Sequence, residues 1–183
     1  VIRTQIMFMY AVKVCLIVAL ASLPLKVSSN DGVSSGSFKA EGPFWPHWVR
    51  LNGPKVRTNE GKMVTTEITG GYNIGSFFVT ESGSDLFPEG AAFEWNAAIY
   101  IEKTGDNVVL KGRGVLVDED GDKFFNIVRR NDGTTEQGGA GMAIFNRGTG
   151  KYKNVKMKCI YDVFFHDTGT GGLPLNCKYV AKK

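Results

Sequence analysis

The chain has 183 residues, of which 43% are hydrophobic and 22% are charged, enough for one folded domain with its own core. These values are ordinary for a globular protein and argue against extended disorder. The formal net charge is +4, but the first 29 residues hold three basic residues, and the rest of the chain has 19 basic against 18 acidic residues. This near-neutral balance gives no electrostatic reason to expect binding to nucleic acid or to an anionic membrane.

The beginning of the chain has the pattern of a secretory signal peptide. An apolar run over residues 14–25 follows a lysine and is too short to span a bilayer. Small residues allow cleavage after Ala21 or after Ser29, and cleavage after Ser29 keeps the apolar run whole; the alternative is an uncleaved N-terminal anchor. We expect a signal peptide over residues 1–29, one domain over residues 30–183, a secreted or periplasmic location, and no stable membrane insertion after removal of the signal.

An aromatic stretch follows a short predicted strand over residues 38–42. Two prolines within residues 42–49 predict irregular structure, although three large aromatic side chains lie close together there. This aromatic loop either plugs one end of the fold or forms the rim of a ligand site. In the second case, Trp45, His47 and Trp48 are the predicted binding residues.

Apolar residues alternate with a period of two along most of the remaining chain, which predicts strands, and no segment has a defensible helical period. The predicted strands cover residues 63–69, 74–80, 91–103, 107–117, 124–130, 141–146, 155–165 and 175–180. Polar, glycine-rich loops are predicted over residues 50–62, 81–90, 131–139 and 167–172. The predicted fold is all-β, a single antiparallel β-barrel of about eight strands, which encloses either side chains or one small ligand.

The hairpin over residues 107–130 is the strongest local signal. Its turn contains the acidic cluster 118–122, in which an Asp-Gly pair favours a tight turn because glycine tolerates positive φ. Gly112 and Gly114 lie two residues apart on one face of the first strand, where larger side chains would collide. Such glycines are typical of a strongly curved, closing sheet.

Three runs carry a resemblance to a known group of proteins. They are Gly112-Arg113-Gly114-Val115-Leu116, the acidic turn Asp118-Glu119-Asp120-Gly121-Asp122, and Arg147-Gly148-Thr149-Gly150-Lys151-Tyr152. Over about residues 90–165 the chain resembles small secreted bacterial proteins of the allene oxide cyclase-like barrel group. The resemblance implies a calycin-like barrel related to plant allene oxide cyclases and dirigent proteins, which guide cyclisation or coupling of reactive small molecules. It covers turn motifs and no catalytic motif, so no catalytic residue is carried over.

Neither glycine-containing turn completes a ligand-binding motif. Lys123 and Arg129 replace the glycine and the glutamate of an EF-hand loop, and Tyr152 replaces the Ser or Thr of a phosphate loop. The two histidines, His47 and His166, have no second His or Cys at zinc-binding spacing. We therefore expect no metal and no cofactor.

The predicted strand over residues 91–103 has one apolar and one polar face. Glu94, Asn96 and Tyr100 share the polar face. They point to solvent if the apolar face lines the core. If the apolar face instead packs outward against a partner, they line the cavity, with Glu94 and Tyr100 as weak catalytic candidates and Asn96 as a binding residue.

Cys159 and Cys177 are the two cysteines that remain once the signal is removed. Both lie in phase with the apolar face of their strands, and a loop over residues 167–174 is long enough to bring the second strand back antiparallel. Export places both cysteines in an oxidising compartment. We expect them to form a disulfide.

Three functions are compatible with these patterns. The leading hypothesis is a non-catalytic module that binds a small apolar molecule or a partner protein. The alternatives are an allene oxide cyclase-like or dirigent-like isomerase or cyclase acting on a small apolar substrate, and a structural or interaction protein with a filled barrel. The sequence has no catalytic motif that would decide whether the protein is an enzyme, and it does not indicate an oligomeric state.

Overall fold

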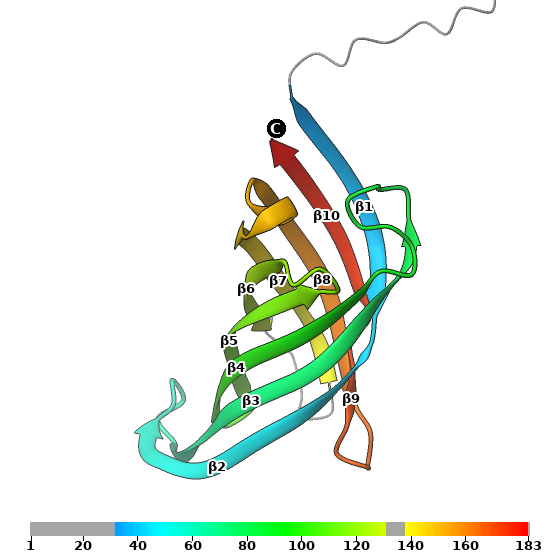
Figure 1. The fold of residues 1–183 in the computed structure, drawn as a ribbon. Coiled ribbons are helices and arrows are strands. Elements are labelled where there is room, and N and C mark those ends of the chain that lie inside the picture. Colours follow the sequence, from blue (N-terminus) through cyan, green and yellow to red (C-terminus); the bar gives the residue numbers. More distant parts are fainter. Residues whose placement is uncertain (1–31, 131–137, 183) are drawn as a thin grey trace, which may run out of the picture. The chain divides into compact units, whose positions relative to one another are not determined.

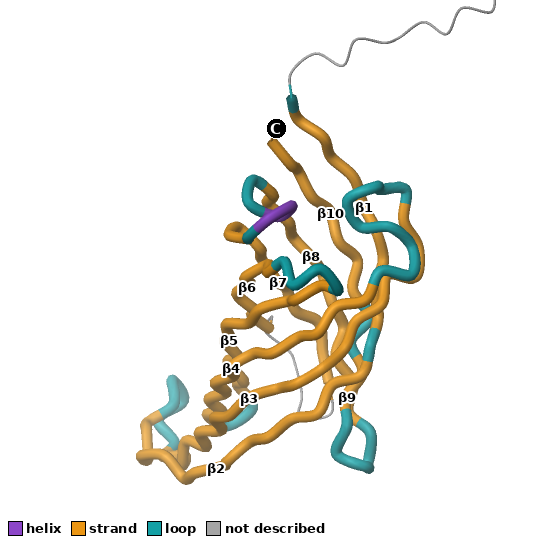
Figure 2. Tube along the Cα trace, in the orientation of Figure 1, coloured by secondary structure: helices purple, strands orange, loops and turns teal. Residues whose placement is uncertain are grey.

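The computed structural model describes residues 32–130 and 138–182 (Figure 1). The predicted signal peptide lies outside the described residues, as does most of the predicted loop over residues 131–139. Ten antiparallel strands make up nearly all of the described part, as the orange segments of Figure 2 show. The strands are β1 (Val33–Glu41), β2 (Pro43–Arg57), β3 (Met63–Ser82), β4 (Ala92–Thr104), β5 (Asn107–Asp118), β6 (Lys123–Arg130), β7 (Gly138–Gly148), β8 (Val155–Phe165), β9 (Gly171–Gly172) and β10 (Leu175–Lys182).

Eight of these strands close into a hydrogen-bonded ring in the order β1-β10-β8-β7-β6-β5-β4-β3, with β3 pairing back onto β1. The other two strands extend the ring. Strand β2 continues from β1 after Gly42 and pairs with β3, while β9 pairs with both β2 and β8. The Leu173 N–H donates a 3.1 Å hydrogen bond to the Gly42 carbonyl between these segments. The predicted fold class, an all-β antiparallel barrel of about eight strands, is confirmed.

The interior of the ring is filled by the inward half of each strand's alternating pattern. On β4, every second residue from Phe93 to Ile99 is at most 6% exposed, whereas the residues between them are exposed. On β8, every second residue from Val155 to Val163 is buried. Burial of apolar surface on this scale is the main favourable contribution to folding. The period of two in the sequence therefore predicts correctly which face of β4 and of β8 lines the core.

Larger side chains at the two glycines of β5, Gly112 and Gly114, would collide with neighbouring residues, as the sequence predicts. A Cβ atom at Gly112 would lie 2.5 Å from Val128 Cγ2, and one at Gly114 would lie 2.8 Å from Asn126 Oδ1. Both glycines therefore make room for the inward side chains of β6. The hairpin that joins β5 to β6 turns at Gly121, which has a φ of 82°.

The predicted loop over residues 42–62 is wrong, because most of it forms β2. Pro43 is the first residue of the strand, and beyond Phe44 the strand pairs with β3 alone. A proline such as Pro46 is tolerated at an open edge, because its missing N–H then removes no ladder hydrogen bond. Tertiary pairing with β3 has overridden the local signal for a loop.

The predicted break between residues 69 and 74 is also wrong, because β3 runs unbroken from Met63 to Ser82. Gly71 lies within this strand, where a side chain would collide with the backbone carbonyl of His47 on β2. The glycine marks a close approach of two backbones and not the end of a strand. A smaller difference is the two-residue strand β9, which falls within the predicted loop over residues 167–172.

Candidate functional site

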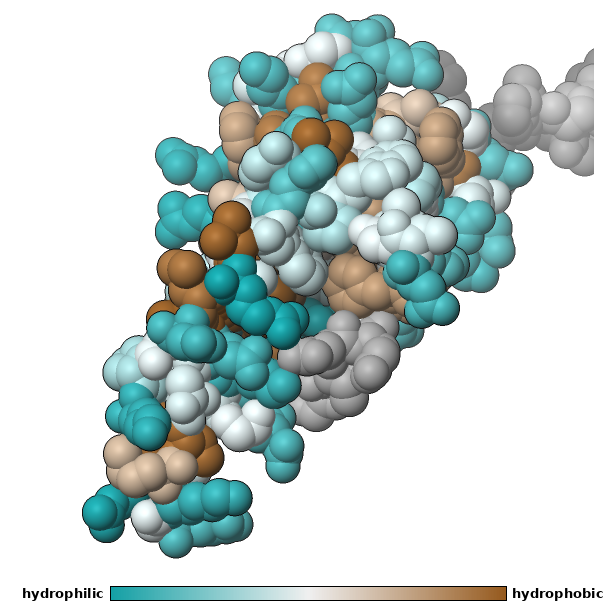
Figure 3. Space-filling view, turned by 90° about the horizontal axis from the view of Figure 1, so that it is seen from below, coloured by the Kyte–Doolittle hydropathy of each residue, from teal (hydrophilic) through white to brown (hydrophobic). Residues whose placement is uncertain are grey.

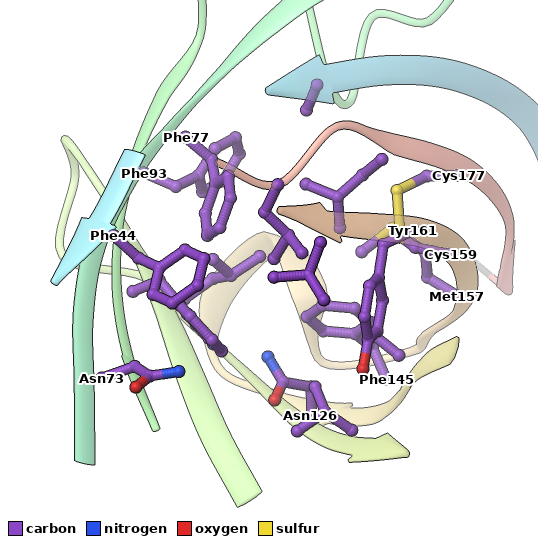
Figure 4. Close-up of a pocket in the computed structure, with 18 of the residues that line it drawn as sticks. Phe44, Asn73, Phe77, Phe93, Asn126, Phe145, Met157, Cys159, Tyr161 and Cys177 are labelled. Carbon is purple, nitrogen blue, oxygen red and sulfur yellow. A yellow bond between two sulfur atoms is a disulfide. The ribbon is translucent and has the colours of Figure 1, made fainter. Parts of the chain in front are cut away.

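The barrel interior contains a small cavity of about 60 Å³ with an almost wholly apolar lining. Figure 4 shows Phe44, Phe77 and Phe93 on one side of it and Phe145 and Tyr161 on the other. A single water needs roughly 10–15 Å³ of such space. The barrel is therefore largely filled by its own side chains, with room left for a few waters or a small organic group.

Among the described lining residues, amide and guanidinium groups come from Asn73 on β3 and from Asn126 and Arg130 on β6. Asn73 and Asn126 are each 5% exposed, and their carboxamides point toward the cavity in Figure 4. The Asn73 Oδ1 accepts a 2.8 Å hydrogen bond from Trp48 Nε1. Among the described residues, no hydrogen-bond partner exists for Asn126 Oδ1 or for the buried Nε and Nη2 of Arg130. Buried polar groups are rarely left unpaired, so these atoms mark the part of the interior most suited to a ligand.

Strand β6 places Asn126 and Arg130 on the same face of the barrel. Phe124, Asn126 and Val128 are all buried, because successive inward positions are two residues apart. Arg130 continues this face at the end of the strand and is partly buried. Two polar residues and one valine thus form an inward line that leads from the deep interior to one end of the barrel.

Burial changes the protonation equilibria of the groups near Arg130. Desolvation lowers the pKa of Arg130, although its charged form stays dominant because arginine starts from a very high value. Desolvation also raises the pKa of Tyr161 to about 12, and the nearby charge of Arg130 limits this rise. The Tyr161 hydroxyl is therefore neutral at ordinary pH and donates a 3.1 Å hydrogen bond to the Arg129 carbonyl. The site holds a cation beside a neutral phenol.

A second small space, also about 60 Å³, lies next to the interior cavity. The two share Trp48, Arg130 and Phe165 as lining residues. The rings of Trp48 and Phe165 meet edge to face with their centroids 5.5 Å apart. These three side chains thus form the boundary between the interior and the mouth of the barrel. The mouth is also lined by charged residues, Arg50, Glu67 and Lys103.

The structure brings one of the predicted binding residues to this site. Trp48 lies at the boundary, whereas Trp45 is 45% exposed and His47 stacks on Tyr72 on the outer face of β2 and β3, with ring centroids 4.8 Å apart. Because side chains alternate along a strand, Trp48 points inward and both Trp45 and His47 point outward. Binding roles for Trp45 and His47 stay predictions.

The other predicted site residues lie on the outer face of β4. Glu94, Asn96 and Tyr100 are all exposed, and the Tyr100 hydroxyl donates a 3.0 Å hydrogen bond to Glu102. The alternative in which the apolar face of β4 points outward is wrong, because Phe93 and Trp95 are buried in the interior. Any role for the three polar residues therefore belongs to the outer surface and not to the cavity.

The sequence analysis missed Asn73, Asn126 and Arg130. Asn126 could have been found, because it is the polar residue on the otherwise apolar face that Phe124 and Val128 define. Asn73 fell within the predicted break in β3 and so had no assigned face. Arg130 is in phase with the same face, but it is charged and is the last residue of the predicted strand, so it was not assigned to the interior.

The two turns that carry the family resemblance contact each other at the β5–β6 turn. Lys151, in the single-turn 3₁₀ helix η1 (Gly150–Tyr152), lies 2.7 Å from Asp118 Oδ2 and 2.8 Å from Asp120 Oδ2. The Tyr152 hydroxyl donates a 2.9 Å hydrogen bond to Asp118, and the Lys151 N–H donates one of 3.0 Å to Asp122. We call this set of contacts the acidic clasp. It joins residues about 30 positions apart and gives the two turns a structural role.

The protonation of the acidic clasp follows from these contacts. Desolvation would raise the pKa of Asp118, but hydrogen bonds from Lys151 and Tyr152 outweigh it and lower the pKa below its usual value of 3.8. Hydrogen bonds to Asp118 and Asp120 raise the pKa of Lys151, so Lys151 and Asp118 both stay ionised. Over residues 32–130 and 138–182, no group of three His, Cys, Asp or Glu side chains is arranged to hold a metal ion.

Cys159 and Cys177 form the predicted disulfide. They lie directly opposite each other on β8 and β10, with Cα atoms 4.0 Å apart, and both are buried. A stable disulfide indicates that the protein matures in an oxidising compartment.

The outer surface also carries exposed apolar side chains. Trp45 and Ile74 are paired across β2 and β3, and Phe78 is exposed further along β3. On the face drawn in Figure 3, hydrophobic residues form small groups among hydrophilic ones. Within the described part of the chain, no helix is long and apolar enough to cross a membrane.

Comparison with known proteins assigns the chain to no family. No family model matches the sequence, and no curated protein matches it significantly.

Proposed function

We propose that the protein is a non-catalytic binding module that takes a small, largely apolar molecule into the end of the barrel bounded by Trp48, Arg130 and Phe165. The observation that carries this proposal is an apolar cavity that contains buried polar atoms without partners among the described residues, on Asn126 and Arg130. Ligand sites in proteins are typically concave and apolar, with a few polar groups that fix orientation. The small volume restricts the ligand to a compact molecule, unless the Trp48 and Phe165 rings turn aside.

The residues around the cavity support binding over catalysis. Within the described part of the chain, the lining of the interior cavity includes no Asp or Glu. An isomerase or cyclase that works by proton transfer needs a group of suitable pKa within reach of its substrate. Neither Arg130 nor Tyr161 meets this need near neutral pH, and the carboxylate at the mouth, Glu67, lies outside the interior cavity and 3.6 Å from Arg50. A purely structural barrel would account for the small cavity, but it would have to pair Asn126 Oδ1 and the Arg130 guanidinium with buried water in place of a ligand.

We also propose that the protein is related to the allene oxide cyclase-like barrel group and is secreted or periplasmic. Support for the relationship comes from the closed ring of eight strands and from the acidic clasp, which unites the two turn motifs of the resemblance. Support for export comes from the Cys159–Cys177 disulfide together with the signal-like pattern of residues 1–29.

Native mass spectrometry of protein purified from its own host tests the proposed binding. We expect a species heavier than the polypeptide by the mass of one small molecule, and we expect this increment to disappear after denaturation. Organic extraction of the same sample should release the molecule for identification. A single species at the mass of the oxidised polypeptide, in protein that has not been exposed to organic solvent, would contradict the proposal.

A further inference from the structure

We infer that the small molecule bound by this barrel carries a carboxylate, which pairs with the Nε–Nη2 edge of Arg130 while its apolar body enters the interior cavity. This inference rests on the proposed binding function and names the chemical class of the ligand. It is carried by the position of Arg130, by the atoms of its guanidinium that have no partner among the described residues, and by the composition of the surrounding wall.

The two unpaired nitrogen atoms of Arg130 lie on one edge of its guanidinium. Nε and Nη2 are both buried, and neither has a hydrogen-bond partner in residues 32–130 or 138–182. Their N–H bonds are parallel and match the two oxygen atoms of a carboxylate, which accepts both in a bidentate pair. A neutral ligand with a single acceptor would satisfy only one of them.

Among the described residues, no carboxylate of the interior lining faces Arg130, and Glu67, which lines the mouth, lies 3.6 Å from Arg50 in an ion pair. Burial lowers the pKa of this group, which means that the surroundings disfavour its cationic form. The described residues of the interior lining supply no carboxylate, and Tyr161 is neutral because burial raises its pKa to about 12. A buried cation without a counter-charge is unfavourable, and an anionic ligand removes that penalty.

The position of Arg130 fits a ligand with a charged head and an apolar body. Arg130 lines both the interior cavity and the space at the mouth, so its guanidinium lies at the boundary between them. Asn126 lies four residues further in on the same face of β6, roughly 13 Å away along the strand. Between them lies Val128, and the opposite wall is aromatic. A short-chain carboxylate can therefore place its head at Arg130 and its hydrocarbon chain inside.

Hexanoate and 1-hexanol are the probes for this inference, since they share a chain length and differ in the charged head. Binding is measured by isothermal calorimetry and by NMR of the three tryptophan indoles, of which Trp48 and Trp95 line the cavity and Trp45 is an outward reference. We expect hexanoate to bind at least about ten-fold more tightly than 1-hexanol, because hydrogen bonds to charged groups contribute more than neutral ones. The indole signals of Trp48 and Trp95 should shift, and that of Trp45 should not.

Two substitutions test whether the preference for hexanoate depends on the charge of Arg130. Arg130→Met should weaken hexanoate binding about ten-fold or more and leave 1-hexanol binding unchanged. Arg129→Met is the matched control, because Arg129 is the neighbouring arginine and is exposed; it should bind both probes as the wild type does. If Arg130→Met fails to fold, as judged by circular dichroism, Arg130→Lys keeps the charge without the bidentate edge and should give an intermediate affinity for hexanoate.

The outcomes separate this inference from the proposed function. Equal binding of hexanoate and 1-hexanol by the wild-type protein overturns the inference and leaves the binding function standing. Equal weakening of hexanoate binding by Arg129→Met and Arg130→Met also overturns it, since surface charge would then explain the preference. Binding of neither probe at millimolar concentration, with no indole shift, counts against both the inference and the proposed function.

Discussion

Trp48 connects the packing of the barrel end with the proposed binding, and Trp45 is its natural control three residues earlier. Trp48→Ala removes the contact with Phe165 and the hydrogen bond to Asn73. We expect it to lower the free energy of unfolding by roughly 2 kcal/mol, which is less than for a fully buried tryptophan. Trp45→Ala, at a 45% exposed position, should change it by less than about 0.5 kcal/mol. Urea denaturation followed by circular dichroism measures both values, and equal effects would contradict the packing described for Trp48.

A substitution at Asn126 is expected to raise stability, whereas Trp48→Ala lowers it. The buried Asn126 Oδ1 has no hydrogen-bond partner among the described residues. Asn126→Leu replaces the carboxamide by an apolar group of similar size. We expect the free energy of unfolding to rise by about 1 kcal/mol, since an unsatisfied buried acceptor is removed. Urea denaturation measures the change. A fall of similar size would mean that the carboxamide is hydrogen-bonded in solution, for instance to buried water.

These residues show how far the sequence could predict the site. The cluster of aromatic residues pointed to Trp48, because large aromatic side chains supply much of the contact area in cores and binding sites. It could not separate Trp48 from Trp45, since that distinction depends on the strand phase of β2, which was predicted as a loop. Alternation along β6 puts Arg130 on the inward face, but the burial of its guanidinium depends on the side chains that surround the end of the strand, which the local sequence does not specify.

At the scale of elements, the acidic clasp should stabilise the barrel in a pH-dependent way. The pKa of Asp118 lies below 3.8 in the folded protein, so the folded state binds its proton less readily than the unfolded chain does. The stabilisation is therefore present above the unfolded value and is lost as the pH falls through the lower, folded value. Asp118→Asn should lower stability near pH 7 by about 2 kcal/mol and should flatten the loss of stability below about pH 4.

Thermal unfolding between pH 2 and pH 7 measures this dependence. Asp106→Asn is the matched control, since Asp106 lies exposed in the turn between β4 and β5. It should keep the acid dependence of the wild type. The prediction for the acidic clasp would be wrong if both variants showed the same profile.

Element prediction succeeded where a strand has one face in the core and two paired neighbours. Strands β4, β5 and β8 agree with the predicted ranges to within about one residue, because burial imposes a strict period of two on them. It failed for β2, where an open edge tolerates Pro46, and for β3, where Gly71 serves a close approach between strands. Proline and glycine were interpreted from local preference alone, whereas the pairing partner decides their meaning.

At the scale of the whole barrel, the closing seam joins the first strand to the last. Strand β1 pairs with β10 over eight residue pairs, and this contact links segments that lie more than 130 residues apart in the chain. Contacts between such distant segments form at a high cost in loop-closure entropy, so the seam is expected to be among the later parts of the ring to form. The Cys159–Cys177 disulfide holds β10 against β8, next to this seam.

Reduction of the disulfide should therefore weaken the seam more than the rest of the barrel. The bond closes a chain segment with a sequence separation of 18 residues, for which the restriction of the unfolded chain contributes about 3 kcal/mol. We expect the reduced and alkylated protein to lose stability by about this amount in urea denaturation. Hydrogen exchange monitored by mass spectrometry should accelerate first in peptides from β1 and β10, while β4 to β6, which pair with neighbours along the chain, keep their protection. Equal acceleration in all strands would instead mean that the barrel opens as one cooperative unit, with the disulfide acting on its global stability alone.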